Sequence, residues 1–586
     1  MGRKELAAAK GAVPADLVIT NGKIVNVYTG EIYDGGVAIS GQTIIAVGEV
    51  DYAIGDGTRV IDAGGNYLTP GFIDGHIHPE STSLSISSFA NLLLKHGTTA
   101  IFTDLHEAGV VGGLAAIESL LDEAARTKLK YYFVVPSHVP FSPNFETSGG
   151  HFDTEIIRGA LKREDAVGLS EAVSVYIILE FPDLLDSIDA TLAAGKSVQG
   201  HLPEVHGPEF NAVAVAGVTT DHEAISPDDG LLRLRGGMHL MIREGSAARS
   251  LEVILPPILE QKLETSRVSI VTDDLHTVDA VERGHLDDSV RTALKAGTDF
   301  ARAIQFVTLN AARAFGMDGQ IGGLAPGKRA DVNITTGPED FKVLSVIAAG
   351  EQVVADGELL APYPVFPHDD ILLSTIHLAR PVTAEDLQIR TDIGTSVQVR
   401  VMDTLQWIPL TEGRDVTLAV KDGVVQADLE QDVLYIAQVE RHGVNGNIGK
   451  AFMGGFRMKA GAIASSVGHD NHNIIVLGTN HEDMALAVNR LAEIQGGQVI
   501  VKDGAVLGEV AYPILGLLSD LPAEELAAKK TELNAIIRDL GSEIPLPFMF
   551  LSFISLAAIP AYAVTDVGFI DVLNQQVLDP VIGPAA

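Results

Sequence analysis

The sequence contains no cysteine, which excludes disulfide bonds, thiol nucleophiles and thiolate metal ligands together. Any metal ion that the protein binds must therefore be held by nitrogen and oxygen atoms. Basic residues are also few, because 41 lysines and arginines stand against 77 acidic residues and give a formal net charge of -36. Such a surface repels nucleic-acid phosphates and anionic lipids, so we expect neither nucleic acid nor membrane among its partners.

Long apolar runs are scarce as well. The N-terminal segment MGRKELAAAKGAVPADLVIT (1–20) mixes polar and apolar residues and lacks the apolar centre of a signal peptide. The stretch PLPFMFLSFISLAAIPAYAV (545–564) is nearly long enough to span a bilayer, but Pro545, Pro547 and Pro560 interrupt it, and we interpret it as buried core. We therefore expect a soluble cytoplasmic protein.

The chain is long enough for several domains, and its texture changes along its length. Residues 1–67 contain short alternating segments that end at glycine or polar turns, which predicts antiparallel strands. Residues 68–320 alternate strand-like and helical stretches over the usual length of a (β/α)8 barrel. Residues 321–380 return to strand texture and are predicted to complete a composite β-sandwich with the N-terminal strands. Residues 381–586 mix strands and helices, which indicates a C-terminal α+β domain.

Polar residues gather where the predicted barrel strands end. His76 and His78 follow YLTPGFIDG, and residues two apart in a strand point to the same side. Other polar residues follow later strands in the same way: His106, Glu107, His138, Glu171, His201, His222, Asp273 and Asp274. All strand C-termini of a parallel barrel open on one face, which holds the active site. The pattern therefore predicts a divalent-metal site with nitrogen and oxygen ligands.

Longer motifs resemble a known family. Five of them are similar to the amidohydrolase superfamily: PGFIDGHIH (70–78), GHLP (200–203), TTDHE (219–223), VTDD (271–274) and GGLAPGKRADV (322–332). Nearly the whole chain more specifically resembles the bacterial adenine deaminases, and four motifs carry that resemblance: TDLHEAGVVGG (103–113), MIREGSAARSL (241–251), ERHGVNGNIGKAFMGGF (440–456) and GAIASSVGHDNHNIIVLGTN (461–480).

The resemblance implies a metal-dependent barrel hydrolase that converts adenine and water to hypoxanthine and ammonia in purine salvage. It implies two divalent ions per subunit, manganese or iron, with zinc also open. The positions that match the family's metal ligands are His76, His78, Glu171, His201, His222 and Asp273. The first two would bind one ion and the later two histidines the other, and Glu171 could bridge them.

Deamination needs proton transfers that carboxyl groups can supply. A divalent ion lowers the pKa of bound water towards about 7, and Asp273 would take a proton from that water and pass it to the leaving ammonia. A glutamic acid would protonate the ring nitrogen. Glu171 and Glu80 are both candidates for that role, and the sequence does not separate an acid from a metal bridge at Glu171.

The loops near the predicted metal site supply candidates for substrate binding: His106, Glu107, Glu204 and Arg243. Pro79 and Leu105 depart from the family pattern, so contacts to the base could differ there. Glu204 follows His201 by three residues and is either a proton donor or a solvated loop residue. Arg243 could reach a substrate ring or pair with its neighbour Glu244.

Three further questions stay open from the sequence. The chain could act on another cyclic amidine or amide, such as a pyrimidine or a modified purine, or it could be a barrel without catalysis that binds a partner. The segment GHDNHN (468–473) could form another metal site, cover the barrel mouth or make a hydrogen-bonded turn, and we expect it near the active site. We also expect a homo-oligomer, with a dimer as the first choice.

Overall fold

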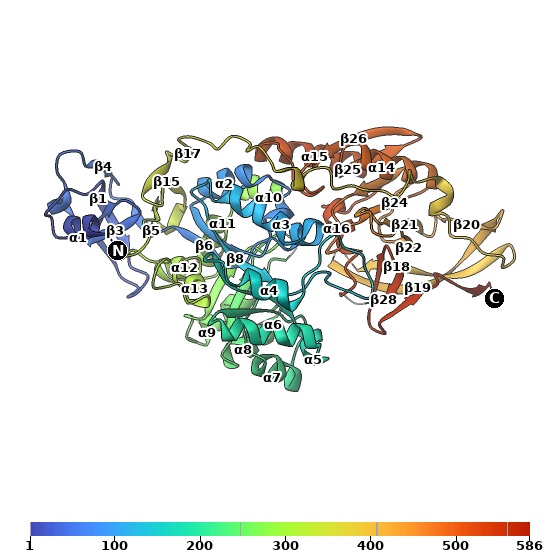
Figure 1. Ribbon diagram of the computed structural model, residues 1–586, viewed down its shortest axis with the longest axis horizontal. Coiled ribbons are helices and arrows are strands. Elements are labelled where there is room, and N and C mark those ends of the chain that lie inside the picture. Colours follow the sequence, from blue (N-terminus) through green and yellow to red (C-terminus); the bar gives the residue numbers. More distant parts are fainter. Residues whose placement is uncertain (1, 247, 406–407, 559–560, 586) are drawn as a thin grey trace.

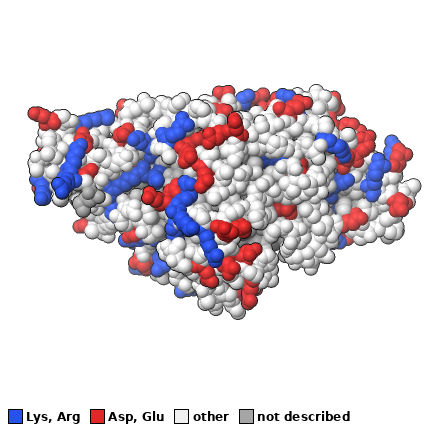
Figure 2. Space-filling view, in the orientation of Figure 1, with Lys and Arg blue, Asp and Glu red and all other residues white. Residues whose placement is uncertain are grey.

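The computed structural model describes residues 2–246, 248–405, 408–558 and 561–585. The molecule is elongated, with the N-terminal strands at one end, the C-terminal domain at the other and a barrel between them (Figure 1). Acidic and basic side chains are interspersed over the face that Figure 2 shows. The barrel and its contacts with the C-terminal domain position the candidate site.

The N-terminal strands and the strands after the barrel form one continuous sheet. It contains β1 (Leu17–Val25), β2 (Ile32–Ser40), β3 (Thr43–Gly48), β4 (Arg59–Asp62), β5 (Tyr67–Pro70), β14 (Val332–Thr335), β15 (Val343–Ala348), β16 (Glu351–Ala355) and β17 (Glu358–Leu359). Strand β14 pairs antiparallel with β5 and joins the two halves. A helix, α1 (Arg3–Ala9), precedes the sheet.

The expectation of antiparallel pairing throughout residues 1–67 is wrong at two strands. Strand β1 pairs antiparallel with β2, but both β4 and β5 pair with β1 in parallel. The segment between β3 and β4 contains the 3-10 helix η1 (Asp51–Ala53). Parallel pairing needs a crossover longer than a tight turn, and this segment provides it.

The barrel sheet follows the chain order. In the ranges described, its eight parallel strands are β6 (Phe72–Asp74), β7 (Thr98–Thr103), β8 (Lys130–Pro136), β9 (Ala166–Val173), β10 (Ser197–His201), β11 (Val218–Asp221), β12 (His239–Arg243) and β13 (Val268–Val271). The first and last strands meet where the His78 amide donates to the Asp273 carbonyl (3.2 Å) and the Asp273 amide donates to the His76 carbonyl (2.9 Å). These bonds close the barrel, and the predicted (β/α)8 fold is confirmed.

Helices between the strands and after the last strand cover the outside of the barrel. They are α2 (Ile86–Lys95), α3 (His106–Ala124), α4 (Thr154–Ala160), α5 (Ser174–Ile178), α6 (Pro182–Ala193), α7 (Gly207–Val215), α8 (Pro227–Arg235), α9 (Leu251–Glu260), α10 (Thr277–Arg283), α11 (Leu286–Lys295), α12 (Phe300–Phe306) and α13 (Leu309–Ala314). Helix α11 shows why: Leu286, Val290 and Ala293 recur every three or four residues and are all fully buried.

The C-terminal domain has the expected α+β character. Its ten-stranded sheet contains β18 (Ser396–Leu405), β19 (Ile408–Lys421), β20 (Val424–Val425), β21 (Leu434–Val439), β22 (Ile448–Gly454), β23 (Ala462–Ser465), β24 (Ile474–Gly478), β25 (Gly497–Lys502), β26 (Ala505–Ala511) and β30 (Val581–Pro584). A smaller sheet contains β27 (Tyr562–Thr565), β28 (Gly568–Asp571) and β29 (Gln576–Leu578). The helices are α14 (His481–Glu493), α15 (Ala523–Asp539) and α16 (Pro547–Phe553).

The C-terminal domain packs on the side of the barrel where the strands end. The Ser85 amide donates to the Ser519 carbonyl (3.0 Å), and the Ser519 amide donates to the Ser83 carbonyl (2.8 Å). Helix α15 also packs on α10. The domain therefore borders the barrel mouth.

The apolar stretch near the C-terminus forms the short helix α16, in which Phe548, Phe550 and Leu551 are buried. Residues 559–560 of that stretch lie outside the described ranges. No helix that the structure describes is both long and apolar enough to cross a membrane.

Candidate metal centre

One carboxylate oxygen of Glu171 lies among four histidine rings at the barrel mouth. Its Oε1 is 3.4 Å from Nε2 of both His76 and His222. The same oxygen is 3.7 Å from Nε2 of His78 and 3.8 Å from Nδ1 of His201. The four histidines lie at or just after the ends of β6, β10 and β11, so the parallel topology brings residues far apart in the chain to one point.

The backbone is held in an uncommon conformation at two of the carboxylates. Glu171 has a φ of 45° and Asp273 a φ of 57°, in the left-handed region that costs free energy for residues other than glycine. Glu171 lies at a shift in the pairing register of β9, and Asp273 lies two residues past the end of β13. These departures aim both carboxylates at the histidine cluster.

Asp273 links the histidines to a buried arginine. Its Oδ1 is 3.4 Å from Nε2 of His76 and 3.5 Å from Nε2 of His78, while Arg243 Nη1 donates to its Oδ2 at 3.0 Å. Burial raises the pKa of Asp273, but His76 and Arg243 outweigh burial and hold that pKa well below its usual range. The Asp273 side chain is thus held as a carboxylate, the form that can bind a cation.

The donor set fits a pair of divalent ions. Two groups of ligand atoms each lie within 4.8 Å of one another: His76, His78 and Asp273, and His201, His222 and Glu223. Buried Nε2 of His76 and Nδ1 of His201 have no hydrogen-bond partner among the described residues. Unpartnered buried nitrogens beside carboxylates are what an ion with nitrogen and oxygen ligands requires.

Two carboxylates of this cluster were missed in the sequence. Glu223 Oε1 lies 3.3 Å from His222 Nε2 and 3.6 Å from His201 Nδ1. Burial alone would raise the pKa of Glu223, but Arg243 and His201 lower it to about 2. Strand alternation predicts that Glu223 points away from its neighbour His222. However, β11 ends at Asp221, so that rule no longer applies.

The other missed carboxylate is Asp104, which follows β7. Its Oδ1 is 3.2 Å from Nδ1 of His78, the ring nitrogen that faces away from Glu171. Ser170 also donates to its Oδ2 at 2.8 Å. A carboxylate on the second nitrogen of a metal-binding histidine fixes the orientation of the ring. The signal in the sequence is the position of Asp104 in TDLHE (103–107), directly after the strand β7.

Glu80 lies beside the cluster in the 3-10 helix η2 (Pro79–Thr82). Its Oε1 accepts a hydrogen bond from the Ala108 amide (3.2 Å), and its buried Oε2 has no partner in the described structure. Burial and the charge of Glu107 raise the pKa of Glu80 to about 8. This carboxyl group has an oxygen available to a ligand.

The predicted substrate-binding residues fall in different settings. His106 and Glu107 begin α3 and are buried, and His106 Nε2 and Glu107 Oε2 have no partner among the residues described. Arg243 is already occupied, because its Nη1 lies 2.9 Å from Glu223 Oε1 and 3.0 Å from Asp273 Oδ2. Glu204 is exposed. The structure thus brings His106, Glu107 and Arg243 to the mouth and leaves Glu204 at the surface.

The alternative pairing of Arg243 with Glu244 is wrong. Glu244 Oε1 instead lies 2.5 Å from Arg249 Nη2. Glu244 also accepts a hydrogen bond from the Leu251 amide at 3.2 Å. The two side chains have different partners because Glu244, just past the end of β12, forms an antiparallel backbone bridge with Arg249.

The GHDNHN segment (468–473) reaches the barrel mouth from the C-terminal domain. His469 Nδ1 is 3.5 Å from Oε1 of Glu107, and the ligand atoms of Glu107, His469 and His472 lie within 4.8 Å of one another. The rings of His469 and Phe553 stack with centroids 4.8 Å apart. The segment therefore lies next to the histidines and carboxylates of the barrel mouth, and its residues are largely buried.

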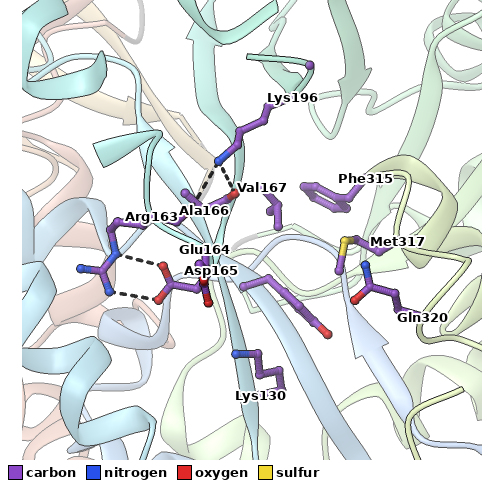
Figure 3. A pocket seen from close by; sticks show the side chains of 12 residues that line it. Lys130, Arg163, Glu164, Asp165, Ala166, Val167, Lys196, Phe315, Met317 and Gln320 are labelled. Atoms are coloured by element: carbon purple, nitrogen blue, oxygen red, sulfur yellow. Dashed lines mark hydrogen bonds and ion pairs between the residues drawn. The ribbon is translucent and has the colours of Figure 1, made fainter. Parts of the chain in front are cut away.

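A cavity of about 740 Å³ lies at the opposite end of the barrel, where the strands begin (Figure 3). Three of its charged side chains are already partnered: Arg163 forms a double hydrogen bond with Asp165 (2.9 and 3.0 Å), and Lys196 donates to the Ala166 carbonyl (2.6 Å). No group of metal-binding side chains in the described ranges includes a residue of this cavity. It is therefore not the candidate centre.

Comparisons with known proteins agree with this architecture. A family model described as the amidohydrolase family matches residues 67–353, and one described as the adenine deaminase C-terminal domain matches residues 409–576. A crystal structure of an adenine deaminase covers 58% of this chain and 99% of that chain, at 18% identity and a TM-score of 0.45.

Two relatives match over almost the full length. The chain is 40% identical to the adenine deaminase of Moorella thermoacetica, over 99% of this chain and 98% of that protein. It is 38% identical to the adenine deaminase of Methanococcoides burtonii, again over 99% of this chain and 98% of that protein. The chain therefore belongs to the adenine deaminase family.

Proposed function

We propose that the barrel mouth hydrolyses adenine to hypoxanthine and ammonia with the help of two divalent ions. The relatives named adenine deaminase, matched over nearly the whole chain, support the reaction. The single structural observation that carries the proposal is the position of Glu171 Oε1 within 3.4 to 3.8 Å of four histidine nitrogens. This carboxylate would help the four histidines to hold the ions.

His76, His78 and Asp273 would hold one ion, and His201 and His222 would hold the other. Manganese or iron suits these nitrogen and oxygen donors, and zinc is compatible with them. When bound, divalent ions supply the Lewis acidity that makes water nucleophilic at neutral pH. Glu171 would hold the ions rather than act as the acid, because its Oε1 lies among the four histidine nitrogens.

The proton transfers fall to two carboxyl groups. Asp273, oriented by the hydrogen bond from Arg243 (3.0 Å), would accept a proton from the attacking water and deliver it to the departing amino group. Glu80, whose Oε2 has no partner within the described chain, would donate a proton to the ring nitrogen as C6 becomes tetrahedral. The hydroxyl proton on C6 would return to Glu80 as the C–N bond breaks, so hypoxanthine and ammonia together contain the atoms of adenine and one water, and both carboxyl groups end in their starting protonation states.

The test is ammonia release from adenine by protein loaded with manganese or iron, with cytosine, adenosine and guanine as parallel substrates. We expect release from adenine and little from the other three. Release from cytosine or guanine in preference to adenine would assign the site to another cyclic amidine. Silence on all four by metal-loaded protein would overturn the proposed reaction.

A further inference from the structure

The GHDNHN loop (468–473) is fixed on the C-terminal domain by hydrogen bonds. The His469 amide donates to the Ser552 carbonyl (2.9 Å), and Ser555 Oγ donates to the His469 carbonyl (2.8 Å). Gln438 Nε2 donates to Asn471 Oδ1 (2.8 Å). A loop held on both sides of residue 470 keeps that side chain in a defined place.

Asp470 is the acidic residue of this loop, and its side chain is the least paired. The polar contact that the described structure gives its carboxylate is with His469 Nδ1, at 3.3 Å. That same nitrogen lies 3.5 Å from Oε1 of Glu107 at the start of α3, so Asp470 stands at the barrel mouth. Its side chain keeps 15% of its surface accessible, whereas His469 and Glu107 keep 7% and 4%. A ligand in the mouth can therefore reach the carboxylate.

Barrel groups from several loops respond to the Asp470 charge. Burial lowers the pKa of His106, but Asp470 and Glu107 outweigh it and leave that pKa raised. Burial lowers the pKa of His138 to about 3, and both Glu171 and Asp470 oppose that shift. The His138 ring is thus close enough to both Glu171 and Asp470 for their charges to act on its pKa.

One phenylalanine ring, Phe141, lies in the same region. The Phe141 ring stacks on His138 with centroids 5.2 Å apart and meets His201, a candidate metal ligand, edge-on at 6.3 Å. The His106 ring lies edge-on at 6.1 Å from it. Nε2 of both His106 and His138 is buried without a partner among described residues. An aromatic face with unpaired polar atoms around it suits a planar heterocycle.

Adenine presents distinct chemistry at its two edges. The amino group on C6 must face the ions, which directs the imidazole edge of the base away from them. That edge of free adenine carries an N–H, which N9-substituted adenines such as nucleosides lack. A carboxylate accepts such an N–H in a charge-assisted hydrogen bond, which is stronger than a neutral one.

We propose that Asp470 accepts the imidazole N–H of the base and so makes the C-terminal domain part of the substrate site. The inference rests on the proposed function and extends it, because it names the residue that favours the free base over N9-substituted adenines. The C-terminal domain then contributes to substrate choice as well as to stability.

The test compares adenine with 9-methyladenine, which has no imidazole N–H, in wild-type protein and Asp470→Ala. The KM for adenine should rise by about 10- to 100-fold in the variant, because a charge-assisted hydrogen bond is lost. The hydrogen bond to Asp470 would be present both in the bound substrate and in the transition state, so its loss should change kcat little. The inhibition constant of 9-methyladenine should change by about threefold or less, since that ligand has no bond to lose.

A second substitution guards against misfolding. Asp470→Asn keeps a neutral acceptor and should raise the KM for adenine less than Asp470→Ala does. Asp566→Asn is the matched control: Asp566 accepts hydrogen bonds from the Thr147 amide (2.9 Å), from Thr147 Oγ1 (2.7 Å) and from Asn473 Nδ2 of the loop (3.4 Å), so this change loosens both the domain contact and the loop while Asp470 keeps its carboxylate. The ratio between the two ligands should stay at its wild-type value in that control.

The outcomes separate this inference from the proposed function. A wild-type protein that does not deaminate adenine overturns both. A wild-type protein active on adenine whose Asp470 variants weaken adenine and 9-methyladenine equally, or neither, overturns the role of Asp470 alone. A rise in the adenine KM with an unchanged 9-methyladenine constant supports it.

Discussion

The two ends of the barrel are built from the same strands but satisfy their polar groups differently. At the mouth, buried nitrogens of His76 and His201 lack hydrogen-bond partners in the described ranges. At the base, Arg163 and Lys196 are paired with Asp165 and with backbone carbonyl oxygens around an open cavity (Figure 3). The two ends therefore differ in these particular groups: the histidine nitrogens at the mouth are open to a ligand, whereas Arg163 and Lys196 at the base are already engaged.

The largest difference between the two ends should appear in catalysis. Asp273→Asn at the mouth should keep the fold and lower kcat for adenine by about 10²- to 10⁴-fold, because the group that moves the proton is lost. Conversion of adenine to hypoxanthine, followed by chromatography, measures this. The same change at the base, Asp165→Asn, should leave kcat within about twofold of wild type. An Asp273→Asn variant with near-native turnover would remove Asp273 from the mechanism.

Metal content provides the second comparison. His222→Asn should lower the bound metal from two ions to one per subunit, because His222 is one of the few ligands of the second ion. Its control is His239→Asn at the base, where His239 Nε2 lies 3.1 Å from Ser269 Oγ and far from the cluster in the strand direction. Elemental analysis of both purified variants decides the matter. Equal metal content in the two variants would contradict the ligand assignment.

Asp104 should show a smaller effect at the mouth. Asp104→Asn keeps the size of the side chain but removes the charge beside His78 Nδ1 (3.2 Å). Loss of such a partner typically weakens metal binding by about 10- to 100-fold. Competition with a chelator of known affinity measures the change. Metal affinity equal to wild type would show that Asp104 does not orient the ring.

Two lysines extend the comparison to stability. Lys530 in α15 is buried at the mouth and donates to Ser83 Oγ (3.1 Å) and Thr277 Oγ1 (3.3 Å), and burial lowers its pKa to about 7. The unfolded chain holds that proton up to a pKa of about 10.4. Between these two values the unfolded state binds more protons, so this residue makes stability rise with pH.

The variant Lys530→Met should therefore flatten the rise of the unfolding midpoint between about pH 7 and pH 10. Lys196→Met at the base serves as its counterpart, because Lys196 is only partly buried and keeps carbonyl acceptors. Thermal unfolding at several pH values gives the curves. Parallel curves for wild type and Lys530→Met would contradict the assigned pKa.

Much of the fold and part of the site could be read from the sequence. Strand and helix alternation predicts the barrel, and the strand-end positions predict that His76, His201 and Glu171 lie on one face. The roles of these residues stay predictions until variants are measured. Pairing direction was harder, because the parallel partners of β1 depend on where a long connection returns and not on local pattern.

Residues whose direction depends on tertiary contacts were not predictable. Glu223 follows His222 directly, and only the end of β11 at Asp221 lets both side chains face the same cluster. Asp470 lies nearly three hundred residues after Glu171, roughly on the scale of two domain lengths, and reaches the mouth only because the C-terminal domain docks there. Sequence motifs indicate residue types, whereas packing decides which of them meet.

The most direct measurement is activity as metal is returned to metal-free protein. Manganese added in steps should restore ammonia release from adenine, and the activity should stop rising at two ions per subunit. This result would support a paired centre around Glu171. Full activity without metal, or saturation at a single ion per subunit, would contradict the paired centre and the function proposed for the barrel mouth.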